Sequence, residues 1–377
     1  MSGQKIVILG LSITSSWGNG HATTYRGLVR ELGRRGHDVL FLERDVPWYA
    51  GNRDLPAPPG GRTVLYDGLA QLWENFAAAV RDADMVIVGS YLPQGTEVAR
   101  WVLATARGVI AFYDIDTPIT LAMLATGDAE YLSADLIPRF DLYLSFTGGP
   151  TLRRLEQEFG ARRARSLYCS VDPEQYFPQP VATRWDFGYL GTYSADRQPP
   201  LESLLLGPAR HWPEGRFVVA GAQFPLNIPW PANVERIDHL PPLRHRNFYN
   251  AQRFTLNLTR ADMLRAGWSP SVRLFEAASC GTAIISDWWP GLDSLFEPGR
   301  EILIAQTPEQ VQGYLRDMPE AERLAIGRRG RRRILNGHTA AHRAAQLEEY
   351  LDLCRASLPY TVVPAQGAPA CQPSIRS

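Results

Sequence analysis

Residues 5–43 read KIVILGLSITSSWGNGHATTYRGLVRELGRRGHDVLFLE, and this stretch decides the fold. It begins with an apolar run at residues 5–10, which is typical of a strand buried on both faces. A helical pattern follows over residues 22–35 and ends at Gly36, and a second apolar run occupies residues 38–43. A strand, a loop, a helix and another strand in this order predict a parallel sheet with helical crossovers.

The same alternation continues in two series. Further strands of the first series are predicted at residues 85–88, 109–113 and 141–145, and those of the second at 187–190, 217–220, 234–237, 254–258, 283–286 and 301–304. Residues 172–185 contain three prolines and are typical of a linker. The sequence therefore predicts two Rossmann-like α/β domains, residues 1–175 and 186–335. A C-terminal helix is expected at 336–355, with a possible return to the first domain, and a flexible tail at 356–377.

The composition argues against several classes of protein. Lys plus Arg and Asp plus Glu both number 39 among the 377 residues, so a net charge of zero gives no electrostatic argument for a nucleic-acid partner. The Arg-rich run at 327–333 favours a solvated helix face. No apolar run approaches the about 20 residues of a membrane-spanning helix. The scattered cysteines argue against zinc and disulfides and favour a reducing cytoplasm; they are Cys169, Cys280, Cys354 and Cys371.

The stretch most informative about function is AGWSPSVRLFEAASCGTAIISDWWPGL, residues 266–292. Ser269 as N-cap and Pro270 in the first turn predict a helix over 270–280, followed at once by a strand. Ser269, Arg273 and Glu276 are spaced four and three residues apart, so they would share one face of this helix.

Such a face suits a nucleoside diphosphate. The helix start offers free N–H groups to a diphosphate, and Arg273 can add a charge-assisted hydrogen bond. Glu276 can accept both hydroxyls of a ribose. The alternative is that Arg273 and Glu276 form only a surface ion pair, worth about 0.3–0.5 kcal/mol.

The sequence also resembles a known family. Residues 233–304 resemble the C-terminal domain of GT-B glycosyltransferases, with SPSVRLFEAASCG at 269–281 and PGLDSLFEPGREILIA at 290–305. DIDTP at 114–118, SFTGGP at 145–150 and GTYSADRQP at 191–199 are similar to phrases of the CgeB-like, spore-maturation-type branch. The resemblance implies two Rossmann-like, doubly wound domains that face a central cleft, with the nucleotide-sugar in the second domain.

The resemblance also implies the residues that bind the donor. Glu276 matches the second Glu of the E-x7-E motif of retaining relatives, which binds the ribose, whereas the first Glu is replaced by Trp268. The expected donor-binding residues are Gly191, Thr192, Arg197, His239, Arg260, Ser269, Ser271, Arg273 and Glu276. Arg197 and Arg260 have the alternative of being ordinary surface residues, and His239 that of being structural.

The catalytic and acceptor residues are expected in the first domain. His21, after the glycine-containing loop at 15–20, is the candidate base, because an imidazole titrates near neutrality; orienting the loop or the phosphate is the alternative. Asp116, at the end of the strand at 109–113, is a second candidate, with helix capping as its alternative. The expected acceptor contacts are Trp17, Asn19, Asp114 and Thr117.

The predicted reaction is metal-independent transfer of a sugar from a nucleoside diphosphate sugar, with UDP as the first expectation, to a small-molecule or glycan acceptor. No cofactor is expected, and DIDTP is not interpreted as a metal motif. A sugar-nucleotide epimerase of the same fold and a nucleotide-sugar-binding module without catalysis are the alternatives. Acceptor, sugar, base, stereochemistry and oligomeric state stay open at this point.

Overall fold

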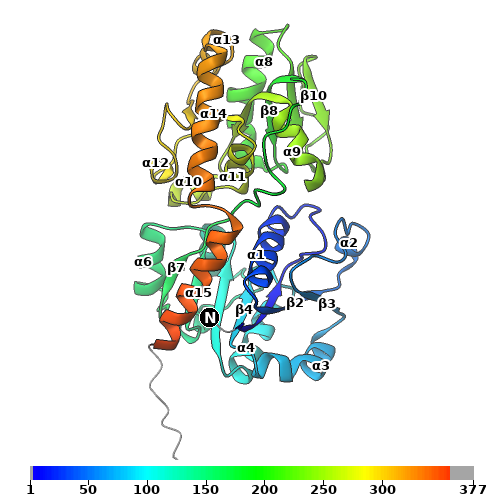
Figure 1. The fold of residues 1–377 in the computed structure, drawn as a ribbon, viewed down its shortest axis with the longest axis vertical. Helices are drawn as coiled ribbons and strands as arrows, with labels where there is room; N and C mark the ends of the chain where they lie inside the picture. Colours follow the sequence, from blue (N-terminus) through cyan, green and yellow to red (C-terminus); the bar gives the residue numbers. More distant parts are fainter. Residues whose placement is uncertain (1–2, 357–377) are drawn as a thin grey trace, which may run out of the picture.

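The computed structural model describes residues 3–356, which form two domains arranged along the long axis of the molecule (Figure 1). The lower domain holds a seven-stranded parallel sheet in the order β3-β2-β1-β4-β5-β6-β7. Its strands are β1 (Lys5–Gly10), β2 (Asp38–Arg44), β3 (Arg62–Tyr66), β4 (Met85–Gly89), β5 (Val109–Asp114), β6 (Leu142–Ser145) and β7 (Ala164–Ser166). Its helices are α1 (Ala22–Arg34), α2 (Pro47–Ala50), α3 (Leu69–Arg81), α4 (Gly95–Thr105), α5 (Thr117–Thr126), η1 (Ala134–Arg139) and α6 (Pro150–Gln157).

The upper domain holds a six-stranded parallel sheet in the order β10-β9-β8-β11-β12-β13. Its strands are β8 (Trp185–Leu190), β9 (Phe217–Ala220), β10 (Val234–Ile237), β11 (Gln252–Asn257), β12 (Ala283–Ser286) and β13 (Leu303–Ile304). Its helical elements are η2 (Ala195–Arg197), α7 (Gln198–Leu201), η3 (Glu202–Leu206), α8 (Gly207–His211), α9 (Pro242–Asn250), α10 (Ala261–Ala266), α11 (Val272–Ser279), α12 (Leu292–Leu295), α13 (Pro308–Asp317) and α14 (Glu320–Leu335). The last helix is α15 (Ala340–Ala356).

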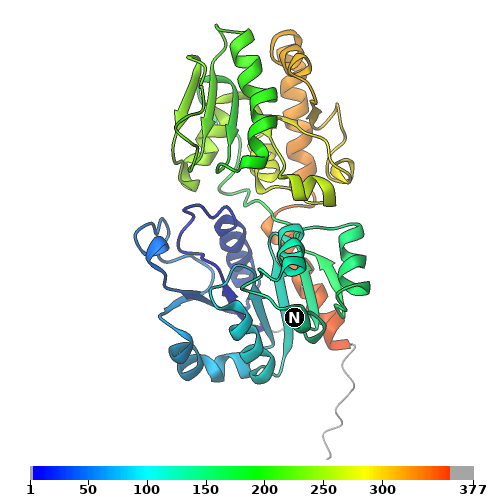
Figure 2. The same ribbon diagram turned by 180° about the vertical axis from the view of Figure 1, so that it is seen from behind.

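Strand β1 shows why these sequences form doubly covered sheets. Ile6 and Ile8 pack into one hydrophobic cluster, whereas Val7 and Leu9 pack into another. Successive side chains of a strand point to opposite faces, so a continuous apolar run requires an apolar layer on each side. Figures 1 and 2 show helices on both sides of each sheet.

The strand order determines where a ligand can bind. In each sheet the order reverses between two adjacent strands, β1 and β4 in the lower domain and β8 and β11 in the upper. Open α/β sheets bind ligands beyond the carboxyl ends of their strands at such a switch point. The two switch points therefore position the loops that end β1, β8 and β11 for binding.

Helix α15 returns the chain to the lower domain, as Figure 1 shows. It packs against α1, and Glu348 accepts a hydrogen bond from Arg35 at 2.8 Å and contacts His37 at 2.7 Å. The expected tail from 356 onward lies outside the described residues apart from Ala356, which ends α15. Between residues 3 and 356, no helix is both long and apolar enough to span a bilayer.

The sequence pattern missed the strands β3 and β7 of the lower domain and its helical elements α2, α5 and η1. Strand β3 is the half-exposed edge of the sheet and follows a Pro- and Gly-rich stretch, so its pattern was weak. Strand β7 has three residues, too few for a periodic signal. Helix α5 begins beside Asp116 and carries Pro118 in its first turn, where proline is tolerated.

Candidate active site

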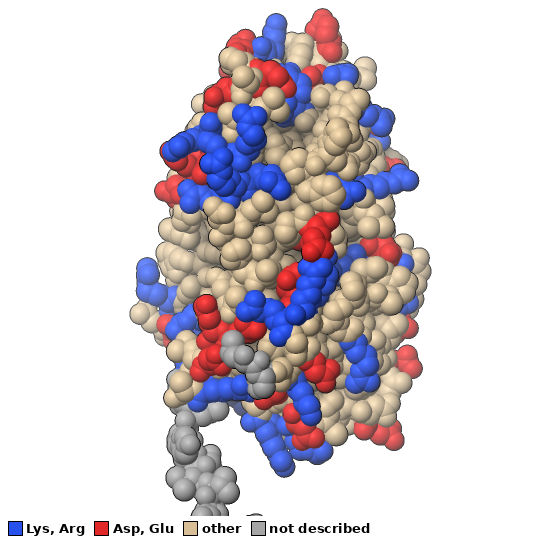
Figure 3. All heavy atoms as spheres, viewed as in Figure 1, with Lys and Arg blue, Asp and Glu red and all other residues tan. Residues whose placement is uncertain are grey.

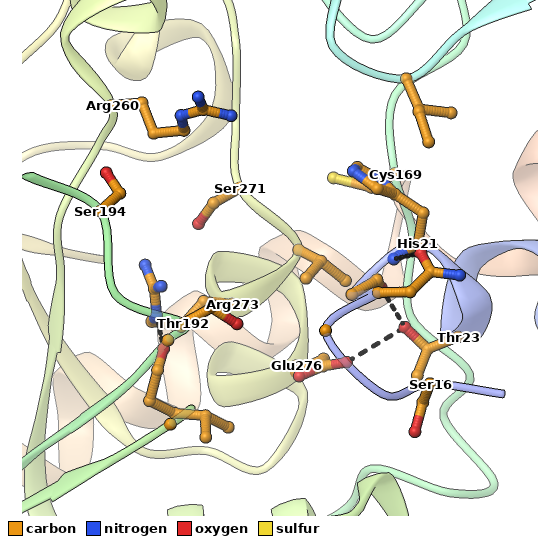
Figure 4. A pocket seen from close by; sticks show the side chains of 18 of the residues that line it. Ser16, His21, Thr23, Cys169, Thr192, Ser194, Arg260, Ser271, Arg273 and Glu276 are labelled. Atoms are coloured by element: carbon orange, nitrogen blue, oxygen red, sulfur yellow. Dashed lines mark hydrogen bonds between the residues drawn. The ribbon is translucent and has the colours of Figure 1, made fainter. Parts of the chain in front are cut away.

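A cavity of about 520 Å³ lies between the two domains, and residues from both line it. The lower domain contributes the loop after β1 and residues that follow β5, and the upper domain contributes the loops after β8 and β11 and the start of α11. Figure 4 shows side chains of the two walls pointing toward one another. A cavity of this size suits a drug-sized or nucleotide-sized ligand.

The helix expected at 270–280 is two residues shorter at its start. Helix α11 begins at Val272, and its N-cap is Ser271, not Ser269. The Ser271 hydroxyl does not cap the helix within the described chain; it donates a hydrogen bond to Asn257 Oδ1 at 2.7 Å. Ser269 lies before the helix and immediately precedes Pro270, and proline disfavours helical backbone in the preceding residue. Its hydroxyl lies 2.8 Å from Thr147 Oγ1 of the lower domain.

Three arginines gather on the upper wall of the cavity. Arg273 is buried, donates to Asn257 Oδ1 at 2.8 Å and stacks 4.7 Å from the centroid of the Tyr189 ring. Arg197 donates to the carbonyl of Thr192 at 2.6 Å. Among residues 3–356, the buried Nε atoms of Arg197 and Arg260 have no hydrogen-bond partner. Burial lowers the pKa of Arg197, and the charges of Arg273 and Arg260 lower it further. This wall can therefore accept an anion.

Glu276 lies on the same wall, one turn along α11 from Arg273. It is 3% exposed and lines the cavity. Tyr249 OH donates to its Oε2 at 3.3 Å, and Thr23 Oγ1 of the lower domain donates to its Oε1 at 3.4 Å (Figure 4). His245 Nδ1 lies 3.4 Å from Oε2.

The sequence analysis missed His245 and Tyr249. Both residues lie on α9, which runs from Pro242 to Asn250. The four-residue spacing of His245 and Tyr249 would place both on one helix face and was the available signal.

The lower wall brings together both predicted catalytic residues. His21 Nε2 lies 4.0 Å from Asp116 Oδ2, which also accepts a hydrogen bond from Tyr91 OH at 3.0 Å. Arg260 Nη1 approaches the same Asp116 oxygen across the cleft at 3.6 Å. In the described chain His21 Nδ1 has no partner. Burial lowers the pKa of His21; Asp116 raises it and Arg260 lowers it again. The imidazole is therefore neutral and able to take a proton at neutral pH.

The remaining predicted donor residues line the cavity: Gly191, Thr192, His239, Ser269 and Ser271. Asn19 does so too, but its amide donates to the Ser12 carbonyl at 3.1 Å and its Oδ1 accepts from the His21 backbone, so it shapes the loop.

Three expected acceptor contacts are not part of the cavity lining within residues 3–356: Trp17, Asp114 and Thr117. Asp114 is fully buried under the start of α5, where it accepts hydrogen bonds from Tyr143 at 2.6 Å and Thr120 at 2.7 Å. Burial raises its pKa to about 6. Thr117 is also buried, 2.7 Å from Ser145 Oγ. Strand β5 ends at Asp114, so Asp116 no longer follows strand geometry and the two carboxylates do not face the same space. No group of three or more metal-ligating side chains occurs in the part described.

Trp268 connects the domains instead of facing the cavity. Its carbonyl accepts a hydrogen bond from the Gly148 N–H at 2.9 Å. Its indole is so close to Gly149 and Gly291 that a Cβ at either glycine would approach it to 2.5 Å. Both glycines have positive φ, 56° and 93°, so neither position favours a side chain. An aromatic residue between the domains thus occupies the position at which the sequence resemblance places the first Glu of the motif.

Two of the five arginines of the Arg-rich run in α14 form ion pairs. Arg329 donates to Glu322 at 2.8 Å and Arg333 donates to Glu301 at 2.8 Å. Figure 3 shows acidic side chains beside the basic ones of the upper domain.

Comparisons with known proteins agree with this arrangement. Residues 197–349 match the family model described as "Glycosyl transferase-like". No curated protein matches the chain in sequence. A sucrose-phosphate synthase from Thermosynechococcus elongatus matches in structure with a TM-score of 0.67 at 14% identity, over 94% of this chain and 100% of that one. HepE from Anabaena in complex with UDP-glucose matches with a TM-score of 0.68 at 13% identity, over 93% and 100%.

An α-glucosyltransferase in complex with UDP and DNA matches with a TM-score of 0.67 at 13% identity, over 94% of this chain and 100% of that one. The chain therefore has the GT-B fold, which confirms the predicted fold class. The family match over residues 197–349, together with this fold, supports a glycosyltransferase.

Proposed function

We propose that this chain transfers a sugar from a UDP-sugar to a hydroxyl of a small-molecule or glycan acceptor, without a metal ion. The observation that carries the proposal is the upper wall, where three arginines and Glu276 line one cavity. Arginines neutralise a diphosphate, and a carboxylate about one helical turn away accepts the hydroxyls of the attached ribose. UDP is proposed because HepE and the α-glucosyltransferase were solved with UDP or UDP-glucose.

In the proposed reaction, the bond between the anomeric carbon and the diphosphate oxygen breaks while the acceptor oxygen bonds to that carbon. Arg197, Arg260 and Arg273 stabilise the charge that develops on the leaving diphosphate. His21 is the candidate to take the proton of the acceptor hydroxyl, since it lines the cavity and burial lowers its pKa, which keeps the imidazole neutral. Asp116 stabilises the imidazolium that forms. Approach from either face of the sugar is compatible with this assignment.

At the finer level, we propose membership of the CgeB-like branch, on the phrases at 114–118, 145–150 and 191–199. We also propose a reducing, cytoplasmic location. Three buried cysteines in the described chain are free thiols, which supports such a compartment.

Among the alternatives, an epimerase would convert a UDP-sugar in the absence of any acceptor. Incubation with UDP-sugars alone separates it from a transferase.

The proposal is tested by calorimetry of UDP binding to Glu276→Gln. The amide cannot accept hydrogen bonds at both positions, so we expect the affinity to fall by about tenfold to a hundredfold. Glu297→Gln is the matched control, because this exposed carboxylate pairs with Arg300 far from the cavity and should leave the affinity unchanged. Equal affinity of Glu276→Gln and the unmodified protein would remove the ribose assignment.

A further inference from the structure

A buried asparagine holds Arg273 on the upper wall of the cavity. Asn257 ends strand β11 and is 0% exposed. Its Oδ1 accepts hydrogen bonds from Arg273 Nη1 at 2.8 Å and from the Ser271 hydroxyl at 2.7 Å, and its Nδ2 donates to Ser286 Oγ at 2.9 Å. A guanidinium can only donate, so the amide oxygen must face Arg273 and the orientation of the amide is fixed.

The guanidinium of Arg273 is held at the switch point of the upper sheet. Its Nε donates to the carbonyl of Leu190 at the end of β8, and its Nη1 lies 3.3 Å from the carbonyl of Leu258, just after β11. Strands β8 and β11 are the adjacent pair at which the strand order reverses. Arg273 is therefore fixed by the two strand ends beyond which an open α/β sheet binds its ligand.

Arg273 has no ion-pair partner within residues 3–356, because its hydrogen-bond acceptors there are one amide and two carbonyl groups. The side chain is nevertheless buried, with 6% of its surface exposed, and it lines the cavity. A buried charge is costly unless an opposite charge compensates it. An anion bound in the cavity is the group that can supply this opposite charge.

Two acids in the same domain are held by other groups. Asp287 accepts hydrogen bonds from the N–H of Thr259 at 2.7 Å and from its hydroxyl at 2.9 Å. Glu276, one turn along α11 from Arg273, contacts the hydroxyl of Tyr249 at 3.3 Å. A carboxylate with the shape of the Asn257 amide would form an ion pair with Arg273 and neutralise it. The amide instead positions the guanidinium and leaves its charge available to the cavity.

We propose that Asn257 is the positioning residue of the diphosphate site: its neutral amide fixes Arg273 and keeps the charge of the guanidinium for the anionic donor. The neutral partner thereby favours a ligand that carries a diphosphate over the uncharged nucleoside. This inference rests on the proposed function, because it assigns a support to one of the arginines that bind the diphosphate there.

The experiment is calorimetry of UDP and of uridine with the full chain carrying Asn257→Asp. This change keeps the shape of the side chain and its contact with Arg273 but adds a negative charge, which the guanidinium keeps ionised. The affinity for UDP should fall by about tenfold to a hundredfold, whereas the weak binding of uridine should stay unchanged. Asn247→Asp is the matched control, because it adds the same charge at an exposed position of α9 and should change neither affinity.

Asn257→Ala keeps the inference testable if circular dichroism shows that the charged variant does not fold. This change removes the contact that fixes Arg273 without adding a charge. The affinity for UDP should then fall by a smaller factor, about threefold to tenfold, and the binding of uridine should again stay unchanged.

A merely structural asparagine would give a different result. Unchanged UDP affinity in a folded variant, or equal weakening of UDP and uridine, would overturn the inference. Arg273→Gln separates this failure from failure of the proposed function. If Arg273→Gln weakens UDP alone and Asn257→Asp binds UDP as the unmodified protein does, only the role of Asn257 is wrong. If Arg273→Gln also binds UDP as the unmodified protein does, the diphosphate assignment itself fails.

Discussion

The two walls of the cleft differ in how tightly their functional groups are held. On the upper wall, Arg273 and Arg197 donate to Asn257 and to the Thr192 carbonyl of their own domain at 2.8 and 2.6 Å. On the lower wall, His21 and Asp116 stand 4.0 Å apart, longer than a hydrogen bond. Under the proposed function, these two arginines are already fixed for the donor, whereas the contact between His21 and Asp116 tightens when substrates fill the cavity.

The largest effect is expected from His21→Ala. Loss of a general base should lower kcat by about 10²–10⁴-fold while UDP affinity changes little, because the proposed diphosphate and ribose contacts are on the other wall. Steady-state kinetics and calorimetry on the same variant measure both quantities. His211→Ala, an exposed histidine on α8, is the control and should retain full kcat.

If His21→Ala keeps its kcat, the assignment of catalysis to the lower wall and of donor binding to the upper wall is wrong. The pH profile gives an independent check on the unmodified protein. Because burial lowers the pKa of His21, kcat/KM should rise with pH and level off below the ordinary histidine value of 6.5.

The next largest effect is expected on the pH dependence of stability, through the buried carboxyl group of Asp114 in the lower domain. Burial raises the pKa of Asp114 from 3.8 to about 6. Between these two pH values the carboxyl group keeps its proton in the folded protein, whereas the unfolded chain has lost it. The stabilisation is complete below pH 3.8 and is lost as pH rises through about 6. Against Asp114→Asn, which does not titrate, the unmodified protein should lose roughly 3 kcal/mol of unfolding free energy from about pH 4 to about pH 7.5.

Urea denaturation of both proteins at the two pH values measures this difference. Asp141→Asn is a suitable control, because this carboxylate is only half-buried and pairs with Arg162 at the far end of β6. A constant difference between Asp114→Asn and the unmodified protein would mean that Asp114 is ionised in the folded state.

The sequence predicted the upper wall better than the lower one, for a physical reason. Arg273 and Glu276 lie three residues apart on one short helix, so local spacing alone puts them on one wall. Asp114 and Asp116 straddle the end of a strand, where no period applies. The sequence could not indicate which carboxylate faces the cavity and which is buried.

Local sequence patterns also could not predict contacts between elements that are far apart in the sequence. The pairing of His245 with Glu276 depends on how α9 packs beside α11. The fit of Trp268 against Gly149 and Gly291 depends on the meeting of the two domains. The parallel sheets, in contrast, were predicted because two-sided burial leaves a continuous apolar run in each strand.

The smallest effect is expected from substitution of two arginines, which differ in whether they contact the opposite domain. Arg197 contacts its own domain, whereas Arg260 also lies 3.6 Å from Asp116 of the lower domain. Arg197→Gln and Arg260→Gln should each lower UDP affinity about tenfold, as expected for one charge-assisted contact, and should leave the weak binding of uridine unchanged. Calorimetry with UDP and with uridine measures both.

The kinetic pH profile then distinguishes the two arginines. The charge of Arg260 lowers the pKa of His21, so Arg260→Gln should move the rise of kcat/KM to higher pH. Arg197 is not among the principal influences on that pKa in the described structure, so Arg197→Gln should leave the midpoint in place. Equal shifts in both variants would show that the two walls are coupled by overall charge. A shift in Arg260→Gln alone would show that the charge of Arg260, which reaches across the cleft, sets part of the pKa of His21.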